Sequence, residues 1–303
     1  MLTALIATWL AGRRAGGFLL KTLERDLQPF VELSAARGEE HIRAATAIEW
    51  AAQAATPGQR YQRFQKVAQL ARYLHAEDPR HEILPAGLFS PKWHRPVPYI
   101  YSPDDERRLF EVATHLGSSE TIRPHAVTAV LALLFATGLR GSEALALCTG
   151  DVTPDGLVIR NTKFGKTRLV PLHASATRGL ASYLGRRRAF AGNEDHVFLR
   201  APGKRLGPRA FRYWWDLILL GSGIRPPPPA RRPRIHDIRH TFAVRALESA
   251  PDLRNRIDRH MLAVSTYLGH SRIADTYWYF QATPSLMSQV ADALQKSFEG
   301  ERP

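Results

Sequence analysis

Histidines and an arginine lie one helical turn apart in the last third of the chain, in residues 235–242, IHDIRHTF. On a helix His236 and Arg239 share one face, and His240 lies one turn after His236. A guanidinium can hold an anionic oxygen, and an imidazole can also move a proton. His236 and His240 have the spacing of a zinc-binding helix too, but Asp237 stands where a metalloprotease has its glutamate base. We therefore expect an anion site without a metal ion.

A second arginine follows an apolar helix. Apolar residues fill 127–135, Gly138 is placed to end that helix, and Arg140 opens the next one. Glu143 lies one turn after Arg140, where its carboxylate can hold the guanidinium while the free edge meets an anion. An ordinary helix salt bridge is the alternative interpretation of this segment alone.

A histidine and two tyrosines lie near the C-terminus, in residues 266–279, TYLGHSRIADTYWY. Gly269 can end one helix and Ser271 can begin the next, so His270 lies at a corner between helices. A corner histidine that only caps or packs is the alternative. Tyr279 comes nine residues after His270, so the two can share a site only if the chain turns between them.

Two lysines, Lys163 and Lys166, lie between two short β-branched runs. The runs are 157–160 and 167–172, and residues 161–166 separate them, which predicts a β-hairpin or small sheet. A lysine on a tight turn is usually only solvated, so this signal is weak by itself.

The charge of the chain favours an anionic partner. Its 303 residues hold 42 Lys and Arg against 28 Asp and Glu, a formal charge of +14. Arginine suits two-pronged contacts to phosphate, so nucleic acid is the first expectation, with an arginine-rich proteome as the alternative. The single cysteine, Cys148, excludes an internal disulfide and a cysteine-based zinc site, and it fits a reducing cytoplasm. No apolar stretch reaches transmembrane length, so we expect no membrane partner.

Helical patterns on both sides of a proline-rich segment must position these residues. An amphipathic stripe from Leu19 to Leu33 and stretches at 44–55 and 59–74 predict a helical domain, residues 1–90. The third stretch interleaves basic residues with aromatic ones, which suits a surface that tracks phosphates. A solvated helix face is the alternative. The basic residues in question are Arg60, Arg63 and Lys66.

Prolines between Pro85 and Pro98 indicate a linker, which we place at 91–101. Ser102 then caps a new helix, with a proline in its first turn. Residues 102–303 follow as a second domain, mostly helical with a small β-sheet.

Together the four segments resemble the tyrosine recombinase family, which includes phage integrases and chromosome-dimer resolvases. The family's first-arginine motif is TGLRGSE at 137–143, its His-x-x-Arg box is HDIR at 236–239, and its Leu-Gly-His box is LGH at 268–270. The stretch KTRLVPL at 166–172 aligns with the family's residues just after the hairpin lysine, so that lysine matches Lys163. The family's nucleophilic tyrosine follows the histidine by nine residues, which gives Tyr279. The chain departs at Ile235, often proline in the family, and in its proline-rich stretch at 227–229.

The resemblance implies strand transfer through a 3′-phosphotyrosyl bond, without metal, ATP or any other cofactor. It covers the second domain in detail, and more loosely the first, which looks like the family's core-binding domain. The two domains would form a clamp around DNA. The implied catalytic residues are Arg140, Lys163, His236, Arg239, His270 and Tyr279. Supporting residues would be Glu143 and His240, and DNA contacts would come from Arg60, Arg63, Lys66, Lys166 and Arg168.

The expected partner is double-stranded DNA, bound by a homotetramer on paired sites or together with partner recombinases, in the cytoplasm at the nucleoid. The tail, 284–298, would dock on a neighbouring subunit or pack on its own domain. Tyr277 competes with Tyr279 as the nucleophile. The rival functions are a type IB topoisomerase, a non-catalytic DNA-binding accessory protein and a metal-dependent hydrolase.

Overall fold

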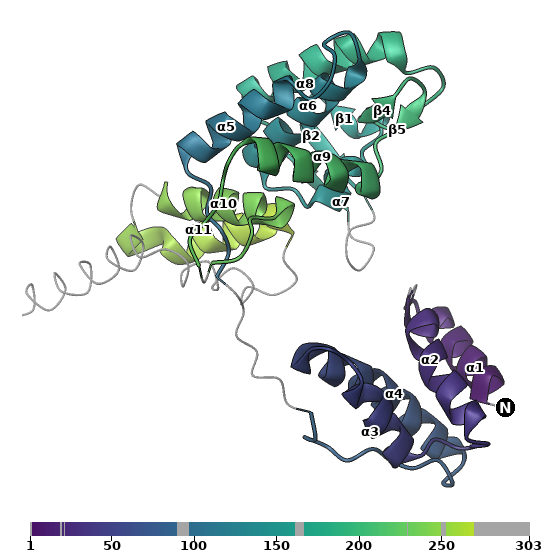
Figure 1. Cartoon of the computed structure of the whole chain (residues 1–303). Helices are drawn as coiled ribbons and strands as arrows, with labels where there is room; N and C mark the ends of the chain where they lie inside the picture. Colours follow the sequence, from purple (N-terminus) through teal and green to yellow (C-terminus); the bar gives the residue numbers. More distant parts are fainter. Residues whose placement is uncertain are drawn as a thin grey trace, which may run out of the picture. The chain divides into compact units, whose positions relative to one another are not determined.

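A computed structural model of the chain describes residues 2–18, 20, 22–89, 97–160, 167–228, 230–249 and 253–269, with the backbone alone at 253–258. The chain divides into two compact units, Met1–Arg95 and Pro96–Pro303 (Figure 1). The division falls within the segment that the sequence predicts as a linker.

In its described residues the N-terminal unit has four helices around one apolar core: α1 (Leu2–Ala15), α2 (Leu23–Ala36), α3 (Ala44–Ala52) and α4 (Pro57–Glu77). α4 begins at a capping box, in which the Thr56 hydroxyl accepts from the Gln59 N–H and the Gln59 side chain accepts from the Thr56 N–H. α2 begins later than the leucine stripe suggests, because Thr22 is its N-cap and Glu24 and Asp26 lie in its first turn, against the helix dipole.

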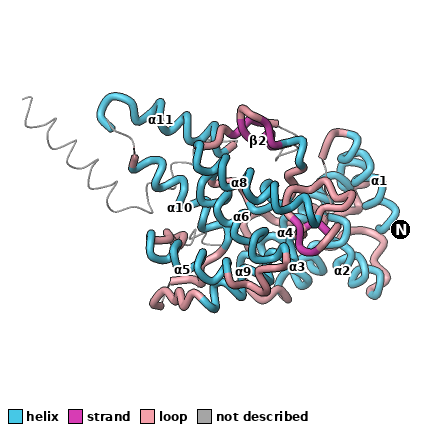
Figure 2. The backbone as a smooth tube through the Cα atoms, turned by 90° about the horizontal axis from the view of Figure 1, so that it is seen from above, coloured by secondary structure: helices cyan, strands magenta, loops and turns pink. Residues whose placement is uncertain are grey.

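The second unit is built around α6 (Ile122–Thr137). Most of its residues are buried, and they lie on all faces of the helix, as expected of a helix that is apolar all round. α5 (Pro103–Thr114), α8 (Ala174–Arg187) and α10 (Ile235–Glu248) pack against it (Figures 1 and 2). α5 begins as predicted, since the Ser102 hydroxyl accepts from the Asp105 N–H at 3.0 Å.

The sheets are small and antiparallel. β1 (Val152–Thr153), β2 (Gly156–Ile159) and β3 (Arg168–Val170) form one sheet, and β4 (Leu199–Ala201) pairs with β5 (Lys204–Arg205). In the first sheet Leu157 lies opposite Val170, and Ile159 opposite Arg168. The predicted pairing of the two β-branched runs is therefore confirmed. The remaining elements are α7 (Gly141–Leu145), α9 (Pro208–Gly221), α11 (Leu253–Leu268) and the short 3₁₀ turns η1 (Thr149–Asp151) and η3 (Arg188–Phe190).

The helix α10 is fixed against the start of its unit. The Tyr101 hydroxyl donates to the Arg234 carbonyl at 3.0 Å, and the Tyr101 N–H donates to the Thr241 hydroxyl at 2.9 Å. Arg245 forms an ion pair with Glu106 at 2.7 Å. α10 packs in turn against α11, so both helices are held by the same body of the unit.

The prediction of a mostly helical fold with a small β-sheet is confirmed. Within the residues that the structure describes, no helix has the length and apolar character needed to cross a membrane. The predicted tail, 284–298, lies outside the described residues.

Candidate active site

The first arginine is held at both its backbone and its side chain. α6 ends at Gly138, whose left-handed backbone (φ 60°) turns the chain toward α7. Arg140 is the N-cap of α7, and its N–H donates to Oε2 of Glu143 at 3.0 Å. Its guanidinium donates to Oε1 of the same residue at 2.7 Å. The Arg140 side chain stays 30% exposed, so part of the guanidinium faces solvent, as an anion-binding group requires.

The second arginine, Arg239, is buried beside the first. It lies on α10 with 2% of its surface exposed. One terminal nitrogen donates to the Gly138 carbonyl at 2.8 Å, and the other donates to the Leu268 carbonyl at 2.7 Å. Because Gly138 lies two residues before Arg140, the first contact places the two arginines at one site. The second contact joins α10 to the end of α11.

His236 and His240 lie on the same helix, with ring centroids 4.8 Å apart in an edge contact. Partial desolvation lowers the pKa of His236 below its usual 6.5, and the charges of Arg239 and Arg140 lower it further. The imidazole is therefore neutral at pH 7 and able to accept a proton. His240 is buried, and its supporting role stays a prediction.

Arg168 points into the protein. Its guanidinium pairs with both oxygens of Glu143, at 3.1 and 2.9 Å, and its Nε donates to the Tyr267 carbonyl at 3.1 Å. The side chain is only 14% exposed. Sequence reasoning assigned Arg168 to DNA contact and missed this arrangement. The only signal in the sequence was that a carboxylate, Glu143, stood near one arginine and could serve two.

Burial raises the pKa of Glu143, but the hydrogen bonds from Arg168 and Arg140 outweigh it and hold the pKa at about 2. The carboxylate is therefore ionised at any pH at which the protein works. One buried negative charge serves two guanidiniums, and this network fixes the position of Arg140.

The basic residues expected to contact DNA in the N-terminal unit also have partners within that unit. Arg60 donates to the Ala54 carbonyl at 2.8 Å. Arg63 lies over the Trp50 ring and donates to the Trp50 carbonyl at 3.2 Å. Lys66 pairs with Asp26 at 2.9 Å. Their contact with DNA stays a prediction.

Several of the predicted residues lie outside the described part of the chain. Lys163 and Lys166 belong to 161–166, between β2 and β3. His270, Tyr277 and Tyr279 follow the end of α11.

One cluster of side chains in the described residues has the composition of a metal site: His41, Asp78 and His81, in the N-terminal unit. Nδ1 of His81 accepts the Ile42 N–H at 3.0 Å, so Nε2 of the neutral ring carries the proton. A metal-bound imidazole has the opposite arrangement, because its second nitrogen donates a hydrogen bond. The cluster therefore does not suit a metal ion as it stands.

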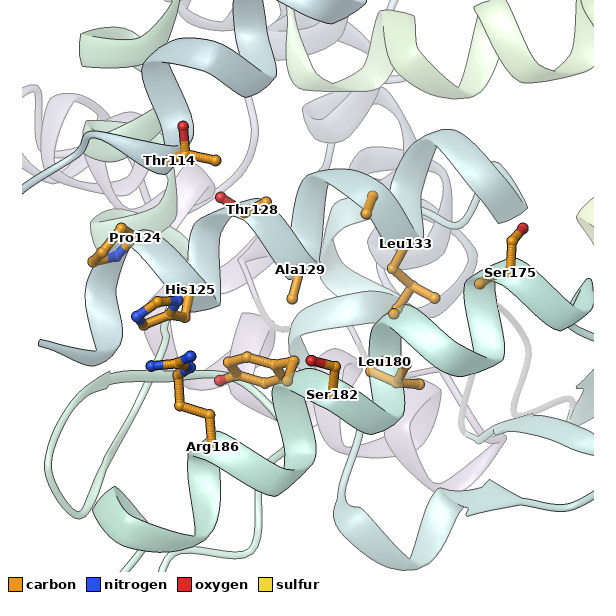
Figure 3. A pocket seen from close by; sticks show the side chains of 14 residues that line it. Thr114, Pro124, His125, Thr128, Ala129, Leu133, Ser175, Leu180, Ser182 and Arg186 are labelled. Atoms are coloured by element: carbon orange, nitrogen blue, oxygen red, sulfur yellow. The ribbon is translucent and has the colours of Figure 1, made fainter. Parts of the chain in front are cut away.

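A pocket of about 370 Å³ lies between α6 and α8 (Figure 3). Thr128, Ala129 and Leu133 of α6 and Leu180 and Ser182 of α8 contribute to its lining. None of the residues predicted for the active site lines it. The candidate active site therefore lies at the arginines and is separate from this pocket.

Comparisons with known proteins agree with the geometry. The sequence profile of the Phage integrase family matches residues 101–285. The protein y4rB of Sinorhizobium fredii is 36% identical, with 95% of each chain covered. The tyrosine recombinase XerD of Brucella abortus is 30% identical over 89% of this chain and 88% of that protein.

Solved structures show the same fold at low sequence identity. The recombinase XerH bound to its difH DNA matches with a TM-score of 0.67 at 18% identity, over 91% of this chain and 79% of that chain. A lambda integrase tetramer bound to a Holliday junction matches with a TM-score of 0.67 at 14% identity, over 92% and 76%.

Proposed function

Because the chain belongs to the phage integrase family of tyrosine recombinases, we propose that the residues matching the family's motifs carry out its strand transfer. The protein is a tyrosine-type site-specific recombinase, an enzyme that cleaves and rejoins DNA. The proposed catalytic set is Arg140, Lys163, His236, Arg239, His270 and Tyr279. The observation that carries this assignment is the 2.8 Å contact of Arg239 with the Gly138 carbonyl, which brings two arginines together from distant segments.

In the first step, the Tyr279 hydroxyl attacks a DNA phosphorus. A phosphorus–oxygen bond forms to the tyrosine, and the bond to the 5′-oxygen breaks, which leaves a 3′-phosphotyrosyl linkage. A phenol with a pKa near 10 is a weak nucleophile at pH 7, so its proton must leave during the attack. The neutral imidazole of His236 takes that proton, or it holds the phosphate oxygens instead. Lys163 gives a proton to the leaving 5′-oxygen as general acid.

The arginines stabilise the charge that builds up on the phosphate. Arg140 and Arg239 bind the non-bridging oxygens, and His270 donates a further hydrogen bond. Fixed donors aimed at developing charge are worth roughly 10²–10³ in rate each. Two guanidiniums supply the positive charge that a metal ion provides elsewhere, and the phosphotyrosyl bond keeps the energy of the broken phosphodiester. The reaction therefore needs neither metal nor ATP.

In the second step, a 5′-hydroxyl from another strand attacks the phosphotyrosine and releases Tyr279. Exchange between two DNA sites requires a subunit at each cleaved strand, so the working assembly is a homotetramer on paired sites, or one completed by partner recombinases. Tetramers on a Holliday junction are known for lambda integrase. An enzyme that rejoins DNA acts at the nucleoid, in the cytoplasm.

The direct test is formation of a covalent protein–DNA adduct in EDTA. We expect the wild-type adduct to form, Tyr279→Phe to abolish it with DNA binding intact, and Tyr277→Phe to keep it. The reason is spacing, since on a helix two residues apart means roughly 200° of rotation and a different face. An adduct from Tyr279→Phe and none from Tyr277→Phe would reverse the assignment. Formation of products that join strands from two different duplexes would identify recombination, because a topoisomerase only relaxes supercoils.

A further inference from the structure

The guanidinium of Arg168 joins two elements that are distant in sequence. Both terminal nitrogens bind the carboxylate of Glu143, at the start of α7. The Nε binds the carbonyl of Tyr267, in the last turn of α11. All three nitrogens are thus occupied by protein groups, and the side chain is nearly buried.

Each of these elements leads to a proposed catalytic residue. Glu143 also accepts the N–H and the guanidinium of Arg140. Tyr267 comes just before Leu268, whose carbonyl is bound by Arg239, and His270 follows two residues later. The end of α11 is also tied to the sheet, because the Tyr267 hydroxyl donates to the Pro171 carbonyl at 3.3 Å.

Arg168 approaches the end of α11 closely at Gly269. Gly269 has a left-handed backbone (φ +70°), and a Cβ at that position would lie 3.0 Å from the guanidinium carbon and from one terminal nitrogen of Arg168. A side chain at this position would be strained by the positive φ, and the guanidinium would have to shift by a few tenths of an ångström to admit it. Glycine at position 269 therefore suits the close contact with Arg168.

We propose that Arg168 is a positioning residue for strand transfer and not a contact to DNA. It acts on Arg140 through Glu143, and on the end of α11 through the Tyr267 carbonyl. Without Arg168, both oxygens of Glu143 are available to Arg140. The two side chains then form a two-pronged pair, which draws the guanidinium away from the phosphate. The proposal rests on the catalytic roles given above for Arg140 and His270.

The test uses the full chain and compares Arg168→Met with Arg168→Lys. The control is Arg160→Met, which removes a nearby arginine that pairs with Asp151 at 2.6 Å and is 59% exposed. We measure the rate of adduct formation at saturating duplex DNA, the Kd for DNA and its dependence on salt. A thermal melt checks that each variant is folded.

We expect Arg168→Met to slow adduct formation by roughly 10²-fold, as a misplacement of about 1 Å does, with Kd and salt slope unchanged. Arg168→Lys keeps the charge but replaces the planar fork with a single nitrogen, so it cannot reproduce all three hydrogen bonds in the same geometry. Its rate should fall between those of the wild type and Arg168→Met. Arg160→Met keeps the wild-type rate. A raised Kd and a salt slope reduced by about 0.9, with the rate at saturation intact, would identify a phosphate contact and overturn the proposal. An unchanged rate in both Arg168 variants would also overturn it.

A pH profile separates positioning from a general loss of structure. Burial raises the pKa of Glu143 and the arginines lower it, so loss of Arg168 moves that pKa toward neutral pH. Protonation of Glu143 then frees Arg140 from the two-pronged pair, so the rate deficit of folded Arg168→Met relative to the wild type shrinks as the pH falls. A profile of wild-type shape contradicts the proposal. A wild-type chain that forms no adduct would instead count against the proposed function, so the two failures are distinguishable.

Discussion

Replacing Gly138 with alanine should lower the stability of the protein and slow adduct formation. The residue has φ 60°, where a Cβ costs about 1–2 kcal/mol. The new methyl carbon would also lie 2.5 Å from Cδ1 of Phe242 and 3.1 Å from a methyl of Leu268. Forcing a group into a packed core costs about 1–3 kcal/mol more. Alanine recovers about 0.4–1 kcal/mol by restricting the unfolded chain, so the net loss is about 1–5 kcal/mol.

Gly223→Ala is the matched control. Gly223 also follows a helix with a left-handed backbone (φ +67°), but a Cβ there would meet nothing within 4 Å. Both variants share the backbone strain and the effect on the unfolded chain, so their difference isolates the steric cost, about 1–3 kcal/mol.

Urea unfolding followed by circular dichroism measures the two losses, and adduct formation is measured where both variants are folded. We expect Gly138→Ala to be the less stable and also the slower, because Arg239 is bonded to the carbonyl of this residue. Equal losses of stability in the two variants would refute the steric argument.

Three further predictions concern charge. Glu143 has a folded-state pKa of about 2 against an ordinary 4.5, so its ionised form stabilises the fold above pH 4.5, and that contribution, on the order of 3 kcal/mol, is lost as pH falls from 4.5 to 2. The free energy of unfolding, measured against pH, should therefore fall more steeply in acid for the wild type than for Glu143→Gln. Parallel curves would contradict the proposed ion pairs of Glu143. If His236 takes the proton of Tyr279, the rate of adduct formation at limiting protein should fall in acid as the imidazole protonates. Because the pKa of His236 is lowered, the midpoint of that fall should lie below pH 6.5. In His236→Gln that limb should disappear, and a persistent limb would assign it to another group. Finally, the +14 charge predicts that log Kd rises with log salt by about 0.9 per contacted phosphate, and a flat response would contradict a clamp around DNA.

The local parts of the site could be predicted from sequence because their partners are close in the chain. Gly138 ends α6 in the left-handed conformation that the pattern indicated. The Arg140–Glu143 pair spans a single turn, so helix geometry alone sets its distance. The order of residues was sufficient in these cases.

The tertiary contacts could not be predicted in the same way. Arg168 lies 25 residues from Glu143 and 99 from Tyr267, and nothing in its own β-strand pattern indicates either partner. Likewise, the alternation of basic and aromatic residues in α4 gave no indication that Arg63 would lie over Trp50. A pattern along one element predicts its faces, but the partner of a charged group depends on how elements pack.

The burial of Arg239 has an electrostatic consequence. α6 and α11 both end beside it, and their terminal carbonyls, those of Gly138 and Leu268, accept its N–H groups. The C-terminal end of a helix carries a partial negative charge of roughly half a unit, so two such ends lower the cost of keeping a cation away from water. These carbonyl bonds satisfy donors of the guanidinium inside the protein. Two helix dipoles thus help to hold a positive charge in place before any phosphate arrives.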